Sequence, residues 1–369
     1  MKSIVKIDLP EKCRIIAVSD IHTCWKLLQE MLNEVSYDPQ KDYLVIVGDI
    51  LEHWHDNIDT LKYIKRLCSD SEKAFCLLGN NDRFCVKMTY TYPYEKFAEK
   101  FHFRGNTFEQ MAGSLGYSEC DPSNWFEIRD AVKNTYGDLL DFIKSFPICL
   151  ETQDHIFVHA GLENRFDWEN TDDNYAITKP WFMREENPTG KWLVVGHFPT
   201  YNYKRSHSTN MPIIDYDKKM ICIDGGLAVK TACQMNLFVI DKNGSEYSYN
   251  NYWKSPYPKY VIKENYTSSL EPQYVDWSNQ HIEVLDYKDG LYKLKDNVTG
   301  AIGYIPKREV YKNQDGSITV YQSLSAFPSV KKGEYVNVCA VDIGHALVIT
   351  ENGKVGWIPK EIIDLNNYE

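Results

Sequence analysis

Side chains that can bind metals follow short apolar runs along the chain. The runs read RIIAVSDIH, YLVIVGD, AFCLLGNND, HIFVHAGL, WLVVGH and MICIDGG, and their length and composition are typical of buried strands. Carboxylate, amide and imidazole groups stand at the ends of the first five runs, at Asp20, His22, Asp49, Asn80, His159 and His197. No thiolate belongs to this set, which therefore suits a hard or borderline divalent cation.

Each of these residues alone has an ordinary explanation, because Asp and Asn cap helices and a buried His is usually satisfied by hydrogen bonds. Together they form an inventory of ligands. Two divalent cations about 4 Å apart need roughly three or four ligands each, including one carboxylate that can bridge them. We therefore expect two divalent metal ions, manganese first, with iron or zinc as alternatives.

Two helices are expected between the first three runs. Apolar residues recur at helical spacing at Leu27, Leu28, Met31, Leu32 and Val35, and again at Ile58, Leu61, Ile64 and Leu67. The alternation of strands and helices over residues 14–80 predicts a largely parallel sheet, which would gather the polar side chains at the carboxyl ends of its strands. Residues 84–145 are rich in helical and aromatic sequence, and we expect a helical insert beside the site.

The composition changes after residue 245. We expect a connector over 246–275, rich in Tyr, Asn, Ser and Pro, followed by an internal repeat in which GYIPKREV at 303–310 recurs as GWIPKEII at 356–363. The copies, at 276–325 and 326–369, resemble tandem bacterial SH3-like domains, which implies two small all-β barrels. Tyr304 and Trp357 then either pack these barrels or line a groove for a protein or peptide partner.

Charge and composition exclude several classes of protein. The 41 Lys and Arg residues against 52 Asp and Glu give a net charge of -11, which disfavours nucleic acid as a partner. The ten cysteines show no CxxC pair and are expected to be reduced thiols. We expect neither a targeting segment nor a membrane span, and hence a cytoplasmic protein.

The motifs become specific in combination. In their order and with their gaps, SDIH, GDI, GNND, VHAGL, WFMRE and VVGHFPT resemble the calcineurin-like metallophosphoesterases, most of all the branch with protein Ser/Thr phosphatases and symmetrical dinucleoside tetraphosphatases. The similarity covers about residues 14–240. It implies an α/β fold over 1–245, in which a β-sandwich is flanked by helices.

The resemblance also implies roles for the strand-end residues. Asp20 and His22 would hold the first metal, and Asn80, His159 and His197 the second. Asp49 would bridge both, and a hydroxide shared by the ions would attack phosphorus. Arg184 in WFMRE stands where the family has a phosphate-binding arginine, although a surface ion pair with Glu185 or Glu186 is the alternative.

Two motifs depart from the family. The usual GDxxDR reads GDILEH, and the usual GNH reads GNND, so that Asn81 replaces the general-acid His, Glu52 replaces its Asp partner and His53 replaces an Arg. Loss of a positioned acid typically costs about 10² to 10⁴ in rate. Either His53 has taken the acid role, or the leaving group departs unprotonated, as a phosphate does, or the site binds without turnover.

Three functions follow in order of preference. The first is a phosphomonoesterase similar to the protein Ser/Thr phosphatases, acting on a phosphorylated protein. The second is a hydrolase of dinucleoside polyphosphates or other nucleotides. The third is a catalytically weak scaffold that binds metal and phosphate for the C-terminal repeats to use.

Overall fold

The computed structural model describes residues 3–53, 55–96, 105–119, 121–203, 205–268, 281–288, 290–320 and 326–365, and the backbone of 273–274 and 324–325. The chain divides into two compact units, which are described separately. The first, here called the catalytic unit, comprises 1–198, 212–228 and 235–254. The second, the C-terminal unit, comprises 199–211, 229–234 and 255–369, so that it takes two segments from the middle of the chain.

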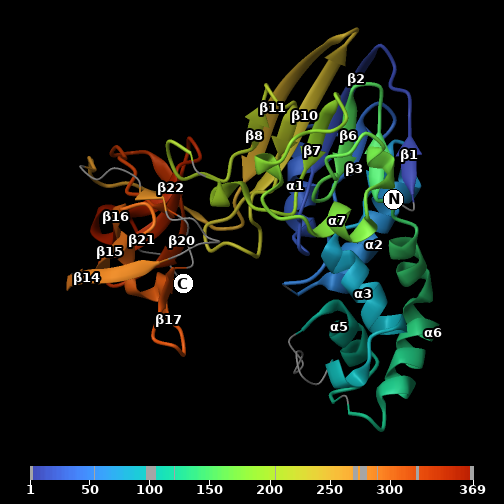
Figure 1. Cartoon of the computed structure of the whole chain (residues 1–369), viewed down its shortest axis with the longest axis horizontal. Helices are drawn as coiled ribbons and strands as arrows, with labels where there is room; N and C mark the ends of the chain where they lie inside the picture. The colour runs from blue at the N-terminus through green and yellow to red at the C-terminus, as the bar shows by residue number, and fades with distance from the viewer. Residues whose placement is uncertain are drawn as a thin grey trace. The chain divides into compact units, whose positions relative to one another are not determined.

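Two mixed sheets form the centre of the catalytic unit (Figure 1). The six-stranded sheet has the order β1 (Ile4–Lys6), β5 (Cys149–Glu151), β6 (His155–Val158), β7 (Trp192–Val195), β9 (Met220–Cys222) and β8 (Ile213–Asp215). The five-stranded sheet has the order β11 (Glu246–Lys254), β10 (Met235–Asn243), β2 (Lys12–Val18), β3 (Tyr43–Ile46) and β4 (Ala74–Cys76). The strands that precede the predicted ligands pair in parallel: β2 pairs with β3 and β3 with β4 in one sheet, and β6 pairs with β7 in the other.

The two sheets share one hydrophobic core. Ile15 and Val45 of the five-stranded sheet pack in the same buried cluster as Phe157 and Val194 of the six-stranded sheet. Facing sheets with apolar inner side chains are the sandwich arrangement of packed layers. The expected α/β fold is thus confirmed, but the sheets are mixed in place of largely parallel, because β5 pairs antiparallel with β6 and β10 with β2.

Helices α1 (Trp25–Glu34) and α2 (Asn57–Asp70) follow β2 and β3, as the apolar spacing predicts. Each buries one stripe: Leu28, Met31 and Leu32 are buried on α1, and Leu61 and Ile64 on α2. The charged side chains lie on the other faces, which is the usual pattern for a helix covering a sheet, although the polar residues Asn57 and Thr60 of α2 are buried too.

The predicted insert is helical. It contains α3 (Asn80–Tyr90), α5 (Thr107–Ser114) and α6 (Trp125–Lys144), which lie together at one end of the catalytic unit in Figure 1. Buried Phe108 and Trp125 join α5 to α6, with ring centroids 5.3 Å apart. Because α3 begins at Asn80, the insert is continuous with a residue that is itself a predicted ligand.

The C-terminal unit consists of small antiparallel sheets. One has the order β12 (Lys259–Val261), β20 (Tyr335–Val341), β21 (His345–Thr350) and β22 (Val355–Pro359), and another the order β14 (Ile282–Lys288), β15 (Leu291–Asp296) and β16 (Ile302–Pro306). Two strand pairs complete the set, β17 (Val310–Lys312) with β18 (Ile318–Val320) and β13 (Gln273–Tyr274) with β19 (Leu324–Ser325). The segment 246–275, expected as a connector, therefore carries β11, β12 and β13.

The internal repeat of the sequence is also a repeat of structure. Pro306 ends β16 and Pro359 ends β22, and a turn of 3₁₀-helix follows each, at Lys307–Glu309 and Lys360–Ile362. Trp357 is buried, whereas Tyr304 is half-buried. The equivalent aromatic positions thus differ in their environment.

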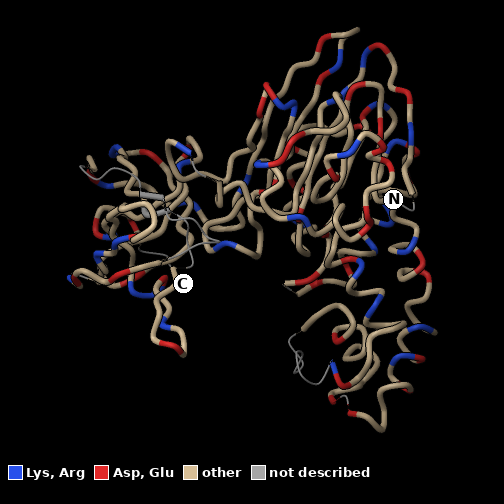
Figure 2. The backbone as a smooth tube through the Cα atoms, viewed as in Figure 1, with Lys and Arg blue, Asp and Glu red and all other residues tan. Residues whose placement is uncertain are grey.

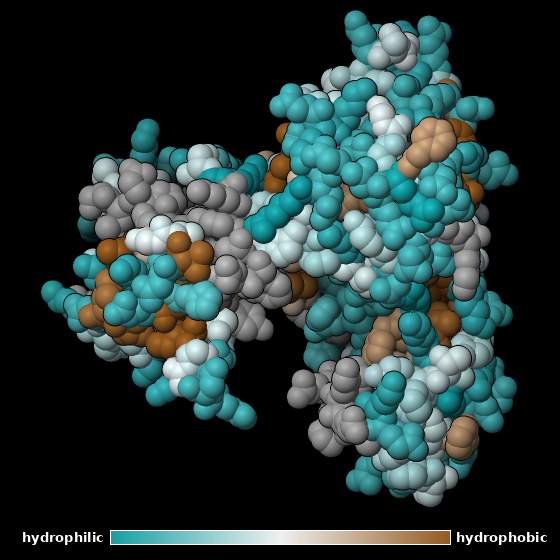
Figure 3. Space-filling model, in the orientation of Figure 1, coloured by the Kyte–Doolittle hydropathy of each residue, from teal (hydrophilic) through white to brown (hydrophobic). Residues whose placement is uncertain are grey.

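The surface shows both charges mixed along the backbone of each unit in the view of Figure 2. Large apolar side chains are exposed in the C-terminal unit, among them Val284, Leu285, Val298 and Ile343, and Figure 3 shows apolar surface on its visible face. In the described part of the chain, the cysteines are free thiols. Within the same residues, no helix has the length and apolarity needed to cross a bilayer.

Candidate metal centre

The residues predicted as ligands converge at the carboxyl ends of β2, β3, β4, β6 and β7. Their ligand atoms form two groups, one of Asp20, His22 and Asp49 and the other of Asp49, His159 and His197, and within each group the atoms lie within 4.8 Å of one another. Asp49 is the member common to both. This is the arrangement that two neighbouring cations joined by one carboxylate require.

The loops that carry these residues are held in an unfavourable backbone conformation. Positive φ angles occur at Asp20 (50°), His22 (39°), Asp49 (52°) and His197 (66°). For residues with a side chain, this left-handed region costs of order 1–3 kcal/mol and is concentrated at functional sites. Four of the predicted ligands have this strained backbone, so the backbone conformation and the ligand chemistry indicate the same site.

Glycine is required where these loops approach each other. A Cβ atom on Gly48, whose φ is +82°, would lie 2.6 Å from Nδ1 of His159. A Cβ atom on Gly79 would lie 2.1 Å from Oδ1 of Asp49. The glycines of the GDI and GNND motifs therefore allow the ligand loops to pack in contact.

Backbone carbonyls orient two of the imidazoles. Nδ1 of His22 donates to the carbonyl oxygen of Leu51 at 2.9 Å, and Nδ1 of His159 donates to that of Val47 at 2.8 Å. Nε2 of each ring then faces the centre, as in metal-binding histidines. His197 is held by a hydrogen bond with the backbone of Thr178.

Asn80 supplies the strongest sign that the site fits a cation. Its amide oxygen lies 3.2 Å from Nε2 of His159 and 2.9 Å from Nδ1 of His197, so that three lone-pair donors converge on one point. In this orientation the amide oxygen can accept a hydrogen bond from Nε2 of a protonated His159, whereas a rotated amide would donate to both rings and to the carbonyl oxygen of Ile177. Oxygen and imidazole nitrogen atoms facing one another in this way satisfy a divalent cation.

The charges of the buried centre are strongly coupled. Burial raises the pKa of Asp20, with the charge of Asp224 adding to the effect. Burial opposes ionisation of Asp49, but the imidazole of His159 outweighs it and lowers the pKa of that carboxyl. In return, although burial alone would lower it, the pKa of His159 is raised to about 10 by Asp49 and Asp20. A bound cation would supply the positive charge that this proton provides.

The other two imidazoles stay neutral. Burial lowers the pKa of His22 to about 4 and that of His197 to about 4. Since a metal binds the unprotonated ring, both are ready to coordinate at neutral pH without losing a proton.

Asn81 acts on the shared carboxylate. Its backbone N–H donates to Oδ1 of Asp49 at 2.9 Å, and its side-chain Nδ2 donates to Oδ2 at 2.8 Å. Each oxygen of Asp49 keeps a further lone pair, so that the carboxylate could bind one cation in each of the two ligand groups. An amide has no proton to release to a leaving group, so this residue orients Asp49 and cannot serve as an acid.

Asp82 is a residue of the site that the sequence analysis missed. Its fully buried carboxylate accepts the backbone N–H groups of Asp49 (2.9 Å), Ile50 (3.0 Å), Leu51 (3.3 Å) and Gly79 (3.0 Å). It thereby joins the loop after β3 to the loop after β4. Burial, followed by the charge of Asp49, raises its pKa to about 7. The only sequence signal was its place in GNND.

Glu52 and His53 point to different surroundings. The carboxylate of Glu52 accepts from Oγ1 of Thr107 at 2.6 Å, which ties the loop after β3 to the start of α5. The exposed ring of His53 lies edge-on to that of His22, with centroids 4.7 Å apart. His53 therefore stands at the rim of the centre, and Glu52 faces the helical insert.

Arg184 is connected to a ligand loop by aromatic packing. Its guanidinium stacks on the ring of Trp181 at 3.7 Å, and Trp181 packs against Phe198 with ring centroids 4.3 Å apart. Phe198 directly follows the predicted ligand His197. The side chain of Arg184 is exposed and in reach of solvent beside this ligand loop.

Asp224 is a second missed residue. It follows β9 as the ligands follow their own strands, it is buried, and its charge acts on Asp20. Oδ1 of Asp224 also accepts the backbone N–H of Gly226 at 2.7 Å. The apolar run MICIDGG was a signal of the same kind as those that identified the other residues.

Comparison with known proteins places the chain in a family. Residues 13–225 match the model for calcineurin-like phosphoesterases, and the chain belongs to that family. Two curated relatives are named symmetrical bis(5'-nucleosyl)-tetraphosphatases. The protein of Dechloromonas aromatica is 27% identical over 146 residues, covering 40% of this chain and 43% of the relative. That of Aromatoleum aromaticum is 30% identical over 148 residues, covering 40% and 44%.

The match therefore spans less than half of the length of these two relatives. Among solved structures, a protein serine/threonine phosphatase of Saccharomyces cerevisiae aligns with a TM-score of 0.41 and 12% identity, covering 69% of this chain and 85% of that one. The family assignment thus rests on the sequence match over residues 13–225.

Proposed function

We propose that the protein is a two-metal hydrolase of phosphoric esters or anhydrides, and that its substrate is a nucleotide with a phosphate chain, such as a dinucleoside polyphosphate. The observation that carries the proposal is the pair of ligand groups that share Asp49. Two divalent cations bound there would polarise phosphoryl oxygens and lower the pKa of water. We expect manganese, with iron or zinc as alternatives.

The residues of the chain divide the remaining work. Asp20, His22, Asp49, Asn80, His159 and His197 would hold the cations, and Asn81 keeps both oxygens of Asp49 directed at them. Arg184, exposed on Trp181, is placed to bind a phosphoryl group that enters the centre. The exposed ring of His53, edge-on to His22, would lie beside a substrate that enters the centre from solvent.

The environment of Asn81 supports an acidic leaving group. Its amide is committed to Asp49 and cannot protonate a departing oxygen. A phosphate departs as a stable anion and needs little protonation, whereas an alkoxide from a serine or threonine ester does need it. The name of the two curated relatives agrees with a phosphoanhydride substrate.

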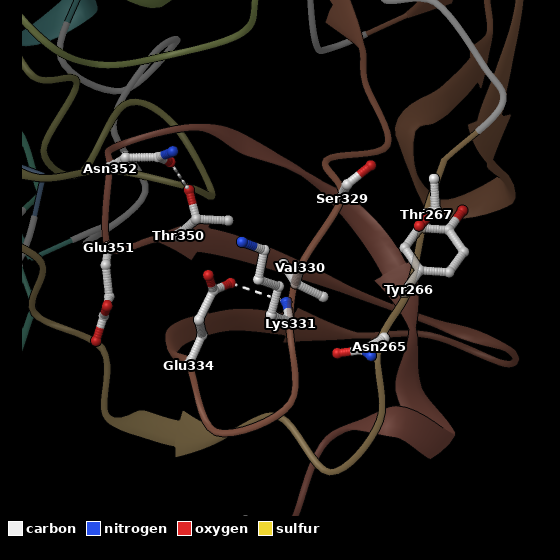
Figure 4. A pocket seen from close by; sticks show the side chains of 10 residues that line it. All are labelled: Asn265, Tyr266, Thr267, Ser329, Val330, Lys331, Glu334, Thr350, Glu351 and Asn352. Atoms are coloured by element: carbon white, nitrogen blue, oxygen red, sulfur yellow. Dashed lines mark hydrogen bonds between the residues drawn. The ribbon is translucent and has the colours of Figure 1, made fainter.

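The C-terminal unit is proposed to bind a protein or peptide partner. Support comes from a cavity of about 560 Å³ within this unit, lined by polar groups and by Tyr266 (Figure 4). In its centre the carboxylate of Glu334 accepts the backbone N–H of Lys331 at 2.9 Å. The lining offers hydrogen-bond donors and acceptors, together with the side chains of Tyr266 and Val330, that a peptide could contact.

The test compares three substrates with manganese-loaded protein. Release of nucleoside diphosphate from a dinucleoside tetraphosphate should be fastest, followed by phosphate release from an aryl phosphate, with a phosphoserine peptide slowest. A phosphopeptide that is the fastest substrate would instead favour a protein phosphatase. Two bound metals without turnover of any of the three would favour the scaffold.

Replacement of His53 by Ala tests its role as an acid. If His53 protonates the leaving group, hydrolysis of an alkyl phosphate should fall more than hydrolysis of an aryl phosphate, because only the alkoxide needs the proton. An unchanged ratio of the two rates would count against this role.

A further inference from the structure

The catalytic unit has a cavity beside the elements that carry the metal centre. Its volume is about 750 Å³, which is within the range of small-molecule sites, and its lining includes Leu78, Arg83, Lys87 and Asn174. Leu78 and Arg83 flank the ligand Asn80 along the chain. Asn174 belongs to α7 (Asp173–Thr178), whose last residue holds His197 through its backbone.

Arg83 and Lys87 present positive charge to this cavity from one face of α3. They lie three and seven residues after Asn80, and a helix brings such positions to the same side. At about 1.5 Å of rise per residue, Arg83 is only one turn from the ligand. A phosphate chain with one group at the cations could therefore place another group near this turn.

The guanidinium of Arg83 is held in position. Its Nη2 donates to Oδ1 of Asn174 at 2.5 Å, and Nδ2 of Asn174 donates to Oγ1 of Thr178 at 3.2 Å. Burial lowers the pKa of Arg83, but an arginine keeps its charge at neutral pH. A fixed guanidinium with further N–H donors is suited to two phosphoryl oxygens.

Two carboxylates also line the cavity and limit its positive charge. Oδ1 of Asp172 accepts the backbone N–H groups of Asn174 at 2.9 Å and Tyr175 at 3.1 Å, which offsets part of its charge. Asp173 acts electrostatically on Arg83. An anion binds here only if its attraction to the side chains of Arg83 and Lys87 exceeds its repulsion by these two carboxylates.

We propose that Arg83, assisted by Lys87, binds a phosphate group of the substrate other than the one that is attacked. The cavity would thus select a phosphate chain over a single phosphate ester. This inference rests on the proposed function, and it assigns the selectivity of that function to α3. In a protein with a net charge of -11, a polyphosphate needs such local positive charge to bind.

The principal test measures KM for a dinucleoside tetraphosphate and for an aryl phosphate in the metal-loaded protein. In Arg83→Ala, the ratio of the two KM values should rise about tenfold, with kcat for the tetraphosphate little changed, because a binding contact common to ground and transition states is lost. Lys87→Ala should raise the ratio by a smaller factor. An equal rise of both KM values in Arg83→Ala, or no rise, overturns the proposal.

Matched variants separate charge from packing. Lys62→Ala removes an exposed lysine of α2 that pairs with Asp59, and it should leave the ratio unchanged. Arg83→Lys keeps the charge and should recover part of the selectivity. Asp173→Asn removes a competing carboxylate and should lower KM for the tetraphosphate; a higher KM would contradict the electrostatic argument.

Binding without turnover distinguishes this inference from the proposed function. If the wild-type protein hydrolyses neither substrate, inorganic tripolyphosphate is titrated calorimetrically into metal-free protein after removal of the chelator. Weaker binding by about tenfold in Arg83→Ala than in the wild type supports the subsite even then. Equal binding by both proteins, or no binding to the wild type, overturns it.

Discussion

The catalytic unit and the C-terminal unit differ in where their backbone is strained. Among the described residues of the catalytic unit, twelve other than glycine have positive φ, and most of them lie in or beside the loops of the metal centre. In the described residues of the C-terminal unit, only glycines do, at turns such as Gly300 and Gly316. A glycine would adopt positive φ without this cost, but the loops of the metal centre keep residues with side chains there because those side chains must converge.

The two units also use buried carboxylates differently. Asp82 in the catalytic unit binds the backbone of two ligand loops, whereas Asp296 in the C-terminal unit accepts the N–H of Val298 and the hydroxyl of Thr299 in its own turn. The first arrangement fixes distant parts of the chain around a site, and the second stabilises one local turn. The comparison teaches that burial of an acid alone does not indicate function.

The largest effect is expected from Asp49→Asn. Because Asp49 is shared by both ligand groups, its loss should reduce hydrolysis by about 10³-fold or more and lower the bound metal below two ions per chain. Elemental analysis and phosphate release measure both quantities. If Asp49→Asn kept full activity and two bound metals, the strained loops of the catalytic unit would not serve to gather metal ligands.

Trp357→Ala should affect stability without affecting the metals. Removal of this buried ring should cost the C-terminal unit about 3–5 kcal/mol, whereas Tyr304→Ala, at the half-buried equivalent position, should cost about 1–2 kcal/mol. Calorimetry and metal analysis test the pair. Equal losses for the two variants would show that the repeat copies are packed alike.

Glu52→Gln should change how stability depends on pH. Burial raises the pKa of Glu52 to about 7 from 4.5, so its neutral form is favoured in the folded protein. Its contribution is then complete below pH 4.5 and is lost as pH rises through 7. In metal-free protein, the free energy of unfolding of the wild type should fall by about 3 kcal/mol relative to that of Glu52→Gln between pH 4.5 and 7. Denaturant unfolding at each pH measures this difference. Parallel curves would contradict the assignment.

Asp82→Asn should have the smallest of these effects. An asparagine offers one acceptor oxygen to the backbone N–H groups that Asp82 now binds, so the ligand loops should loosen and metal affinity fall by about 10–100-fold. Asp296→Asn is the matched control and should leave metal affinity unchanged. A similar loss in both variants would mean that Asp82 acts only through general stability.

The sequence predicted the parts of the site that depend on local pattern. Asp20, Asp49, Asn80, His159 and His197 each follow an apolar run, and parallel strands in each of the two sheets bring these ends together. Asp82 was missed because its partners are backbone groups of another loop, which no side-chain pattern reveals. The direction of Glu52 toward Thr107 depends in the same way on the packing of the insert.

The extent of the C-terminal unit was equally hidden from the sequence. A change of composition near residue 245 is visible, but the contribution of 199–211 and 229–234 is not. These segments pair with residues far away in the chain, as in the bridge between Thr209 and Lys354. Such long-range pairing leaves no periodic signal.

That interleaving determines how the gene could be cut. A fragment that starts at Ser255 would lack the carbonyl of Ser208, which accepts the N–H of Val355 at 2.8 Å, and that of Cys233, which accepts the hydroxyl of Ser255 at 3.0 Å. The upstream piece would keep the segments 199–211 and 229–234 without the rest of their unit, and the first of them begins two residues after His197. The C-terminal unit therefore cannot be exchanged at one junction, because its three segments meet the catalytic unit at five points of the chain, before 199, after 211, before 229, after 234 and before 255.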